Sequence, residues 1–137
     1  MTSPELENLV RAGKLKREPP AVAELEGLRR SGEARLADAQ RPELSIESRF
    51  DLAYNAAHVL ALAALRRLGF RSENRYLVFQ VLPHTLGIVP AVWRVLAKGH
   101  EKRNLAEYEG LLEVDERLVA DMIDAGKVVL AALVGQP

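Results

Sequence analysis

Residues 45–69 read SIESRFDLAYNAAHVLALAALRRLG and form the clearest helix signal in the chain. Ser45 is a favourable N-cap and Gly69 a favourable C-terminal stop, so a helix is expected from about residue 45 to residue 68. Within it, apolar residues recur at steps of three and four, which places them on one helix face. They are Ile46, Phe50, Ala53, Ala57, Leu60 and Ala64. The segment is therefore predicted to be a central core helix.

Helix signals continue on both sides of this segment. Five further helices are expected, over residues 3–13, 21–40, 73–82 and 90–109, and from Asp115 onward. The second of these is mostly polar, so it should be a lightly buried outer helix. Breaks are expected at Pro83, Gly87 and Gly110. The only apolar strand candidate, residues 76–81, would have no partner strand.

The predicted fold class is all-α, an up-and-down bundle of about five to six helices in a single domain. The length of 137 residues fits one domain. Residues 1–42 are expected to form a helical extension and residues 45–134 the bundle. The helices at 45–68 and 90–109 and the last helix should form the core, with residues 73–82 across one end.

The overall composition excludes several function classes. Nineteen basic residues balance nineteen acidic ones, so any contact with nucleic acid has to be local. There is no cysteine, and the three histidines are far apart in sequence, so neither a metal site nor another cofactor is expected. No signal peptide and no apolar run of membrane-spanning length is seen. The expected location is the cytoplasm, without membrane contact.

The segment 90–109 carries the most unusual placement of a charge. Its apolar line runs through Val92, Leu96 and Gly99 and then reaches Arg103. A charge on the buried side of a helix is costly unless something compensates it. Gly99 costs about 1 kcal/mol relative to alanine in a helix interior, which indicates close packing or access at that position. Arg103 is therefore a candidate functional residue.

A second line on the same helix is polar and adds further candidates. It runs through His100, Asn104 and Tyr108. Arg103 and Tyr108 lie about 140° apart around a helix, so one ligand reaches both only in a cleft that wraps the helix end. A two-fold copy of the helix would form such a cleft, which predicts a homodimer. The alternative is a surface ion pair between Arg103 and Glu107, which is common and weak.

The helix at 45–68 offers a polar line of its own. Asp51, Asn55 and His58 follow each other at steps of four and three. His58 could orient a substrate or transfer a proton, although a histidine at a helix contact is often purely structural. The candidate substrate-binding residues are Lys102, Glu107, Asp51, Asn55 and His58. The candidate catalytic residues are Arg103, Asn104, Tyr108 and His100.

The segment Arg103-Asn104-Leu105-Ala106-Glu107-Tyr108, together with the alanine-rich helix at residues 50–58, resembles the HEPN family (higher eukaryotes and prokaryotes nucleotide-binding domain). The similarity covers roughly residues 45–134. Members are four- or five-helix bundles, usually dimeric, with an arginine, often followed by asparagine, and a histidine four to six residues further on. Here Arg103 matches the arginine, Asn104 its neighbour, and Tyr108 takes the place of the histidine.

The resemblance implies a metal-independent ribonuclease or an RNA-binding toxin-type protein. In the family, the arginine polarises a phosphate, the asparagine orients it and the histidine moves protons. A tyrosine is a poor base near neutral pH, so His100 or His58 would have to serve as the base, and His100 lies one turn from Asn104. The tyrosine that is modified in some toxins would fall at Gly110 and is missing.

Two further hypotheses stand beside the ribonuclease. One is a non-catalytic helical module that partners a minimal nucleotidyltransferase, the antitoxin of related systems. The other is a plain dimeric scaffold, in which Arg103 would be tied up in an ion pair with no cleft nearby.

Overall fold

The computed structural model describes residues 3–110 and 113–136, and this part of the chain is an all-α helical bundle. The described elements are α1 (Pro4–Arg11), β1 (Lys16–Arg17), α2 (Val22–Ala39), α3 (Ile46–Arg67), β2 (Phe70–Arg71), α4 (Arg75–Gln80), α5 (Leu82–Thr85), α6 (Pro90–Glu109) and α7 (Glu116–Val134). The predicted helices are confirmed to within a few residues at their ends, apart from the segment that forms α4 and α5.

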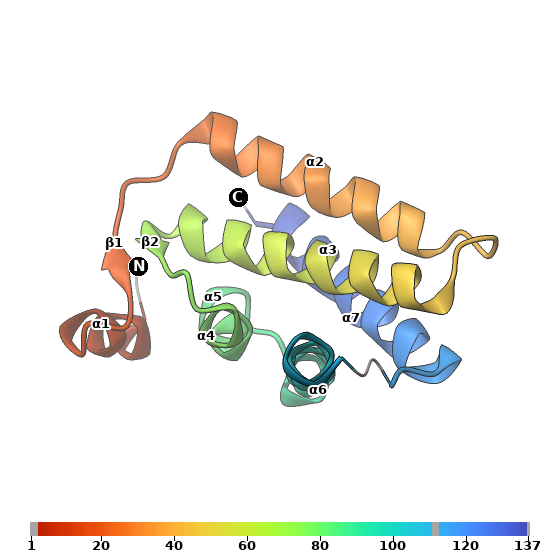
Figure 1. Ribbon diagram of the computed structural model, residues 1–137. Coiled ribbons are helices and arrows are strands. Elements are labelled where there is room, and N and C mark those ends of the chain that lie inside the picture. The colour runs from red at the N-terminus through yellow and green to blue at the C-terminus, as the bar shows by residue number, and fades with distance from the viewer. Residues whose placement is uncertain (1–2, 111–112, 137) are drawn as a thin grey trace.

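Helix α3 is the central element of the bundle. The Ser45 side chain accepts a hydrogen bond from the Ser48 N–H at its start, and Gly69 follows its end with a φ of 90°. Helix α2 runs antiparallel along one side of α3, and α7 packs against another side (Figure 1). Gly32 of α2 allows the close approach, because a Cβ there would lie 2.5 Å from the Leu60 side chain.

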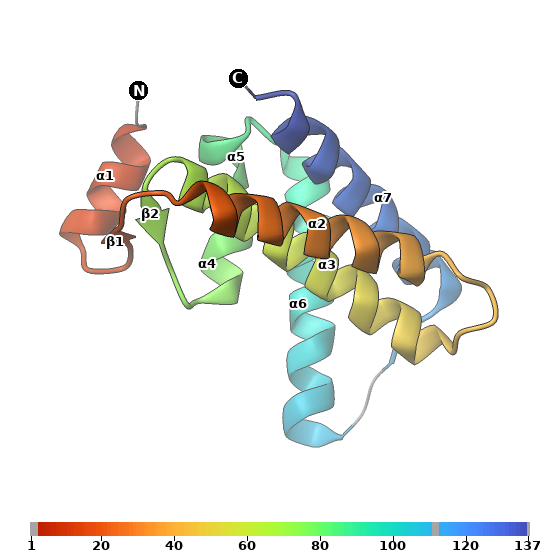
Figure 2. The same ribbon diagram turned by 90° about the horizontal axis from the view of Figure 1, so that it is seen from above.

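Helix α6 crosses the other long helices at a steep angle, so that Figure 1 shows it end-on and Figure 2 from the side. It packs mainly against α4 and α7 and only lightly against α3. Its contact with α7 is close at Gly99, where a Cβ would lie 2.5 Å from the Met122 sulfur. The predicted core of α3, α6 and α7 was therefore incomplete, because α2 packs along α3 more extensively than α6 does.

The predicted helix at residues 73–82 is two short helices instead. Helix α4 ends at Gln80, and Pro83 lies in the first turn of α5 rather than at a break. A proline is tolerated in a first turn because the N–H it lacks would have no partner there. The turn between α4 and α5 leaves the buried side chains of Phe79 and Leu82 pointing into the core.

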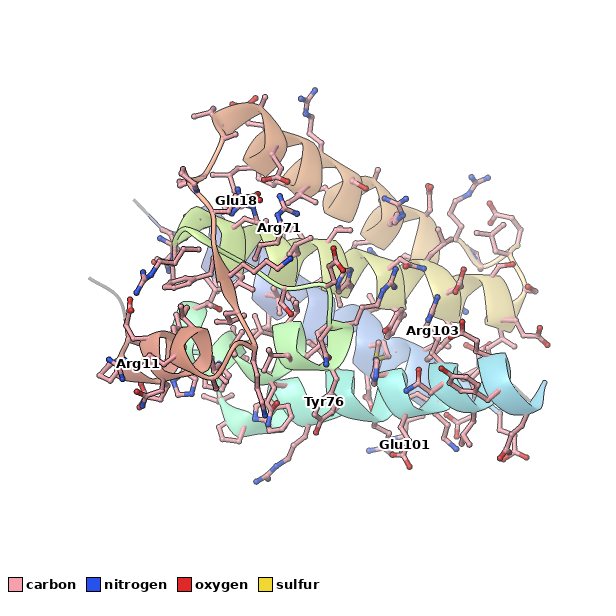
Figure 3. All side chains as sticks on the ribbon, turned by 60° about the vertical axis from the view of Figure 1, so that its left-hand side comes forward. Arg11, Glu18, Arg71, Tyr76, Glu101 and Arg103 are labelled. Carbon is pink, nitrogen blue, oxygen red and sulfur yellow. The ribbon has the colours of Figure 1, made fainter. Side chains whose placement is uncertain are left out.

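The N-terminal segment is fastened to the bundle by a short sheet and a buried arginine. Strand β1 pairs antiparallel with β2, a two-residue pairing that the sequence did not predict. Beside it, the fully buried Arg66 guanidinium donates to the Glu24 carboxylate and to the carbonyls of Glu18, Pro19 and Phe70. Arg71 pairs with the carboxylates of Glu18 and Glu24 (Figure 3).

Candidate functional site

The candidate site lies where α3, α4 and α6 meet, around the buried ring of Phe79. Three aromatic side chains contact this ring edge to face. The Tyr54 centroid is 5.8 Å away, that of His58 6.1 Å and that of His100 6.5 Å. Phe79 and Tyr54 are fully buried. They form an apolar floor on which two histidines from different helices are held close together.

His100 is held by hydrogen bonds at both ring nitrogens. The Asn104 amide nitrogen lies 3.1 Å from Nε2 and donates to it. The neutral ring then carries its proton on Nδ1, which donates to the Tyr54 hydroxyl oxygen 2.9 Å away. The bonds fix the orientation of the His100 ring and link α6 to α3.

Two arginines bring positive charge to this site. The Cζ atom of Arg103 lies 5.1 Å from the centre of the Tyr54 ring, and that of Arg75 lies 5.7 Å from it. Arg75 donates to the Asn55 amide oxygen at 3.1 Å and has no carboxylate partner among the described residues. Arg103 contacts the Glu107 carboxylate at 3.5 Å, a distance too long for a strong ion pair. Figure 3 shows Arg103 extending from α6 toward α3.

The same surroundings keep both histidines neutral. Burial, together with the charges of Arg75 and Arg103, lowers the pKa of His58 to about 4. Burial, with the same two charges, also lowers the pKa of His100. Burial raises the pKa of Tyr54, although Arg75 opposes this effect, so the phenol stays protonated. The site therefore offers two guanidinium cations and two uncharged imidazoles at neutral pH.

Three of the predicted site residues, Asp51, Tyr108 and Lys102, lie apart from this group. Asp51 is exposed, and its backbone carbonyl accepts a hydrogen bond from the Asn55 side chain. Tyr108 is 83% exposed near the end of α6 and contacts none of the site's rings among the described residues. The structure thus gathers Asn55, His58, His100, Arg103 and Asn104, with Glu107 at the edge through its contact with Arg103.

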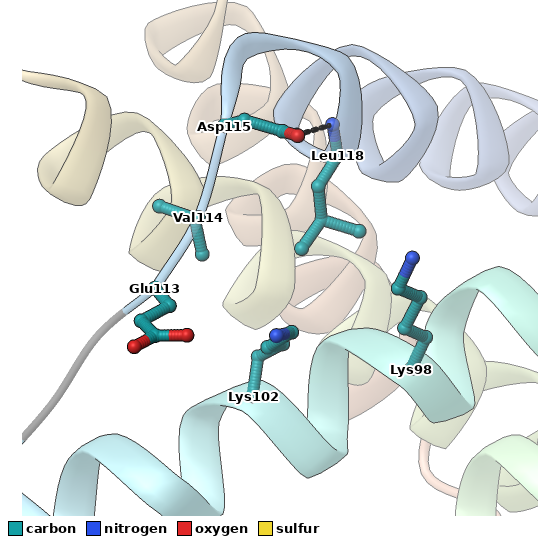
Figure 4. Close-up of a pocket in the computed structure, with 6 residues that line it drawn as sticks. All are labelled: Lys98, Lys102, Glu113, Val114, Asp115 and Leu118. Atoms are coloured by element: carbon teal, nitrogen blue, oxygen red, sulfur yellow. Dashed lines mark hydrogen bonds between the residues drawn. The ribbon is translucent and has the colours of Figure 1, made fainter.

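Lys102 lies on another side of α6. Together with Lys98 it faces a hollow of about 340 Å³ below the start of α7 (Figure 4). Glu113 and Asp115 line the same hollow, and the Asp115 carboxylate accepts from the Leu118 N–H as the N-cap of α7. The carboxylates offset the lysines, so this hollow has no clear preference for an anion.

Sequence reasoning missed two members of the site, Tyr54 and Arg75. Tyr54 lies on the apolar side of α3, one turn after Phe50, and its pattern is that of a core residue. Arg75 belongs to a helix of six residues, too short for a reliable periodicity. A buried tyrosine hydroxyl usually has a hydrogen-bond partner, and only this requirement could have indicated that Tyr54 meets a polar group.

No protein-family model, curated protein or solved structure matches the chain. Within residues 3–110 and 113–136, no three histidine, aspartate or glutamate side chains gather closely enough to hold a metal ion. In the same part of the chain, no helix has both the length and the apolar character needed to cross a membrane.

Proposed function

We propose that the chain is a HEPN-like RNA-binding protein that holds a phosphate group between Arg75 and Arg103. The observation that carries the proposal is two guanidinium groups over one buried tyrosine ring, of which only Arg103 contacts a carboxylate among the described residues, that of Glu107 at 3.5 Å. Arginine binds phosphate through paired N–H donors and charge. The resemblance of Arg103 and Asn104 to the family motif favours RNA as the source of that phosphate.

The proposal includes metal-independent cleavage of the bound strand. A ribose 2′-hydroxyl would attack the adjacent phosphorus, and the bond from phosphorus to the 5′-oxygen would break. His58 would take the hydroxyl proton, because its ring has no hydrogen-bond partner in the described part of the chain, whereas both nitrogens of His100 are occupied. The departing 5′-oxygen would take a proton from solvent, and the arginines would stabilise the charge on the phosphate.

A test of binding uses a fluorescein-labelled 12-nucleotide oligouridylate. Arg75→Gln and Arg103→Gln are each expected to weaken binding about tenfold or more, the usual effect of losing a charged hydrogen bond. Arg117→Gln, which removes an exposed arginine of α7, is the matched control and should leave the affinity nearly unchanged. Equal affinities for all four proteins would contradict the proposed phosphate site.

Cleavage is tested with the same oligonucleotide in the presence of EDTA. The unchanged protein should give products with a 2′,3′-cyclic phosphate, and His58→Gln should abolish them while retaining the fold. Binding without cleavage would leave an RNA-binding protein without the nuclease step. Absence of both binding and cleavage would favour the alternative, a helical module that partners a nucleotidyltransferase.

We also propose that the protein is a homodimer joined through the end of α6. This helix projects beyond the rest of the bundle (Figure 2), and it exposes two large apolar side chains there. Leu105 is 40% exposed and Tyr108 83% exposed. A second copy would cover them and bring two sites near each other. Analytical ultracentrifugation should show a dimer that Tyr108→Arg converts to a monomer, whereas a monomeric wild type would contradict the proposal.

A further inference from the structure

A second hollow adjoins the proposed phosphate site and has the features of a nucleotide subsite. It lies between α4 and α6 and has a volume of about 550 Å³. His100 and Asn104 belong both to the candidate site and to the lining of this hollow, so the two are continuous. The other lining residues that matter are Tyr76, Arg94, Lys98 and Glu101.

Tyr76 supplies an aromatic surface inside this hollow. Its side chain extends from α4 toward α6 (Figure 3), and its ring centre lies 5.5 Å from that of His100. The residue is 39% exposed, unlike Tyr54 and Phe79, which are buried. An aromatic side chain that is held in place on one side and open on the other can stack with an unpaired base.

Two cations line this hollow, and one of them, Lys98, also lines the hollow below α7. Arg94 and Lys98 are one turn apart on α6, and both are exposed. Neither forms an ion pair with any described residue, although most arginines of this chain do. Glu101 points outward from α6 (Figure 3) and lines the same hollow, where its carboxylate can accept a hydrogen bond from a ribose hydroxyl or a base amino group.

We infer that this hollow binds the nucleotide next to the one held at Arg75 and Arg103, with its base on Tyr76 and its phosphate at Arg94 and Lys98. The inference rests on the proposed function, and it specifies the ligand as a single-stranded polynucleotide rather than a free nucleotide. A duplex fits poorly, because its bases are stacked on each other and cannot reach Tyr76. The balanced overall charge agrees with binding that is local to this face.

The test compares a labelled 12-nucleotide oligouridylate with uridine monophosphate, which occupies only one position. Tyr76→Ala is expected to weaken the 12-mer about tenfold through lost stacking, and Tyr76→Phe should restore its affinity. The double variant Arg94→Gln/Lys98→Gln should also weaken the 12-mer and reduce the slope of log affinity against log salt by about 1.4. Affinity for the mononucleotide should be the same in all these proteins.

The matched control is Arg30→Gln/Lys127→Gln, which removes two exposed cations from α2 and α7. It should bind the 12-mer like the unchanged protein, and circular dichroism should show all variants folded. If the 12-mer binds equally to Tyr76→Ala, the double variant and the control, the subsite is overturned while the phosphate site stands. If the unchanged protein binds neither RNA nor mononucleotide, the proposed function fails, and the subsite with it.

Discussion

The Tyr54 hydroxyl oxygen lies 2.9 Å from Nδ1 of His100. This contact joins α3 to α6, although the two residues are 46 positions apart in sequence. Tyr54 is fully buried, and this contact gives its hydroxyl a polar partner within the core. The same contact orients the imidazole ring, whose pKa is lowered by burial and by the charges of Arg103 and Arg75. The hydrogen bond that stabilises the packing of α3 against α6 therefore also positions a side chain of the candidate site.

Tyr54→Phe keeps the ring and removes this hydrogen bond. The free energy of unfolding is expected to fall by about 1 kcal/mol, since a buried donor on His100 loses its acceptor. Urea unfolding measures the change. Tyr76→Phe is the matched control, because the Tyr76 hydroxyl has no hydrogen bond within the described residues, and it should change stability by less than about 0.5 kcal/mol. Equal losses in the two variants would contradict the assigned bond.

His58 should make stability depend on pH. Its pKa is lowered from 6.5 to about 4 in the folded protein, mainly by burial. Between these values the unfolded chain binds more protons, so stability is complete above about pH 6.5 and is lost as the pH falls toward 4. Each pKa unit corresponds to about 1.4 kcal/mol, and the partly exposed ring reduces the expected loss to about 2 kcal/mol.

Urea unfolding at a series of pH values measures this dependence, and His58→Gln is the comparison. The variant should show a flatter profile between pH 4 and 6.5, with a remaining slope from His100, whose pKa is also lowered. An identical profile in the two proteins would mean that His58 does not titrate as its surroundings predict.

Arg103→Gln should raise the pKa of both His58 and His100, because the Arg103 charge lowers the pKa of each ring. Titration of the imidazole Cε1–H signals by NMR gives both values directly. Arg94→Gln is the control, because Arg94 lies on the same helix but its charge does not lower the pKa of either ring. A rise of similar size in both variants would show that the effect is not local.

Gly32→Ala should destabilise the packing of α2 on α3. Alanine favours a helix interior by about 1 kcal/mol over glycine, but the added Cβ would lie 2.5 Å from the buried Leu60 side chain. Overpacking of this kind costs about 1–3 kcal/mol, so a net loss is expected. Gly27→Ala is the matched control in the same helix, because a Cβ there meets nothing within 4 Å, and it should increase the thermal midpoint.

Arg66→Lys should lower stability by about 2–3 kcal/mol, although the charge is kept. The guanidinium is 1% exposed and donates to a carboxylate and three carbonyls at once, which a single ammonium group cannot do. Urea unfolding measures the loss. Arg30→Lys, on the exposed side of α2, should be neutral, and an equally neutral Arg66→Lys would contradict the role of this residue in fastening residues 18–19 to the bundle.

Much of the fold could be predicted because helix boundaries depend on local interactions. Ser45 and Asp115 each accept hydrogen bonds from the first turn of the helix that follows, and Gly110 ends α6 with a φ of 70°. The role of Gly99 as a point of close packing was likewise predicted from its position on the apolar line of α6, and Met122 is the residue that meets it. These features are readable because each involves neighbours along the chain or one face of one helix.

The candidate site could be predicted only in part. The lines through His100 and Asn104 and through Asn55 and His58 identified which helix faces are polar, since that follows from the period of a helix. Nothing along the chain indicated that Arg75 would stand beside Arg103, because α4 is too short to show a period. The role of Tyr54 in the site could not be predicted either, because Tyr54 lies in a long apolar pattern in which an ordinary core residue is expected.

The amino-acid sequence by itself determined the longer helices, their ends and the faces that they bury, because capping and hydrophobic periodicity act over a few residues. Only the tertiary structure decided that α6 crosses the bundle and that α3, α4 and α6 bring two histidines around Phe79 and two arginines over the Tyr54 ring. Such convergence depends on how faces distant in sequence pack against each other, and no local pattern encodes that packing.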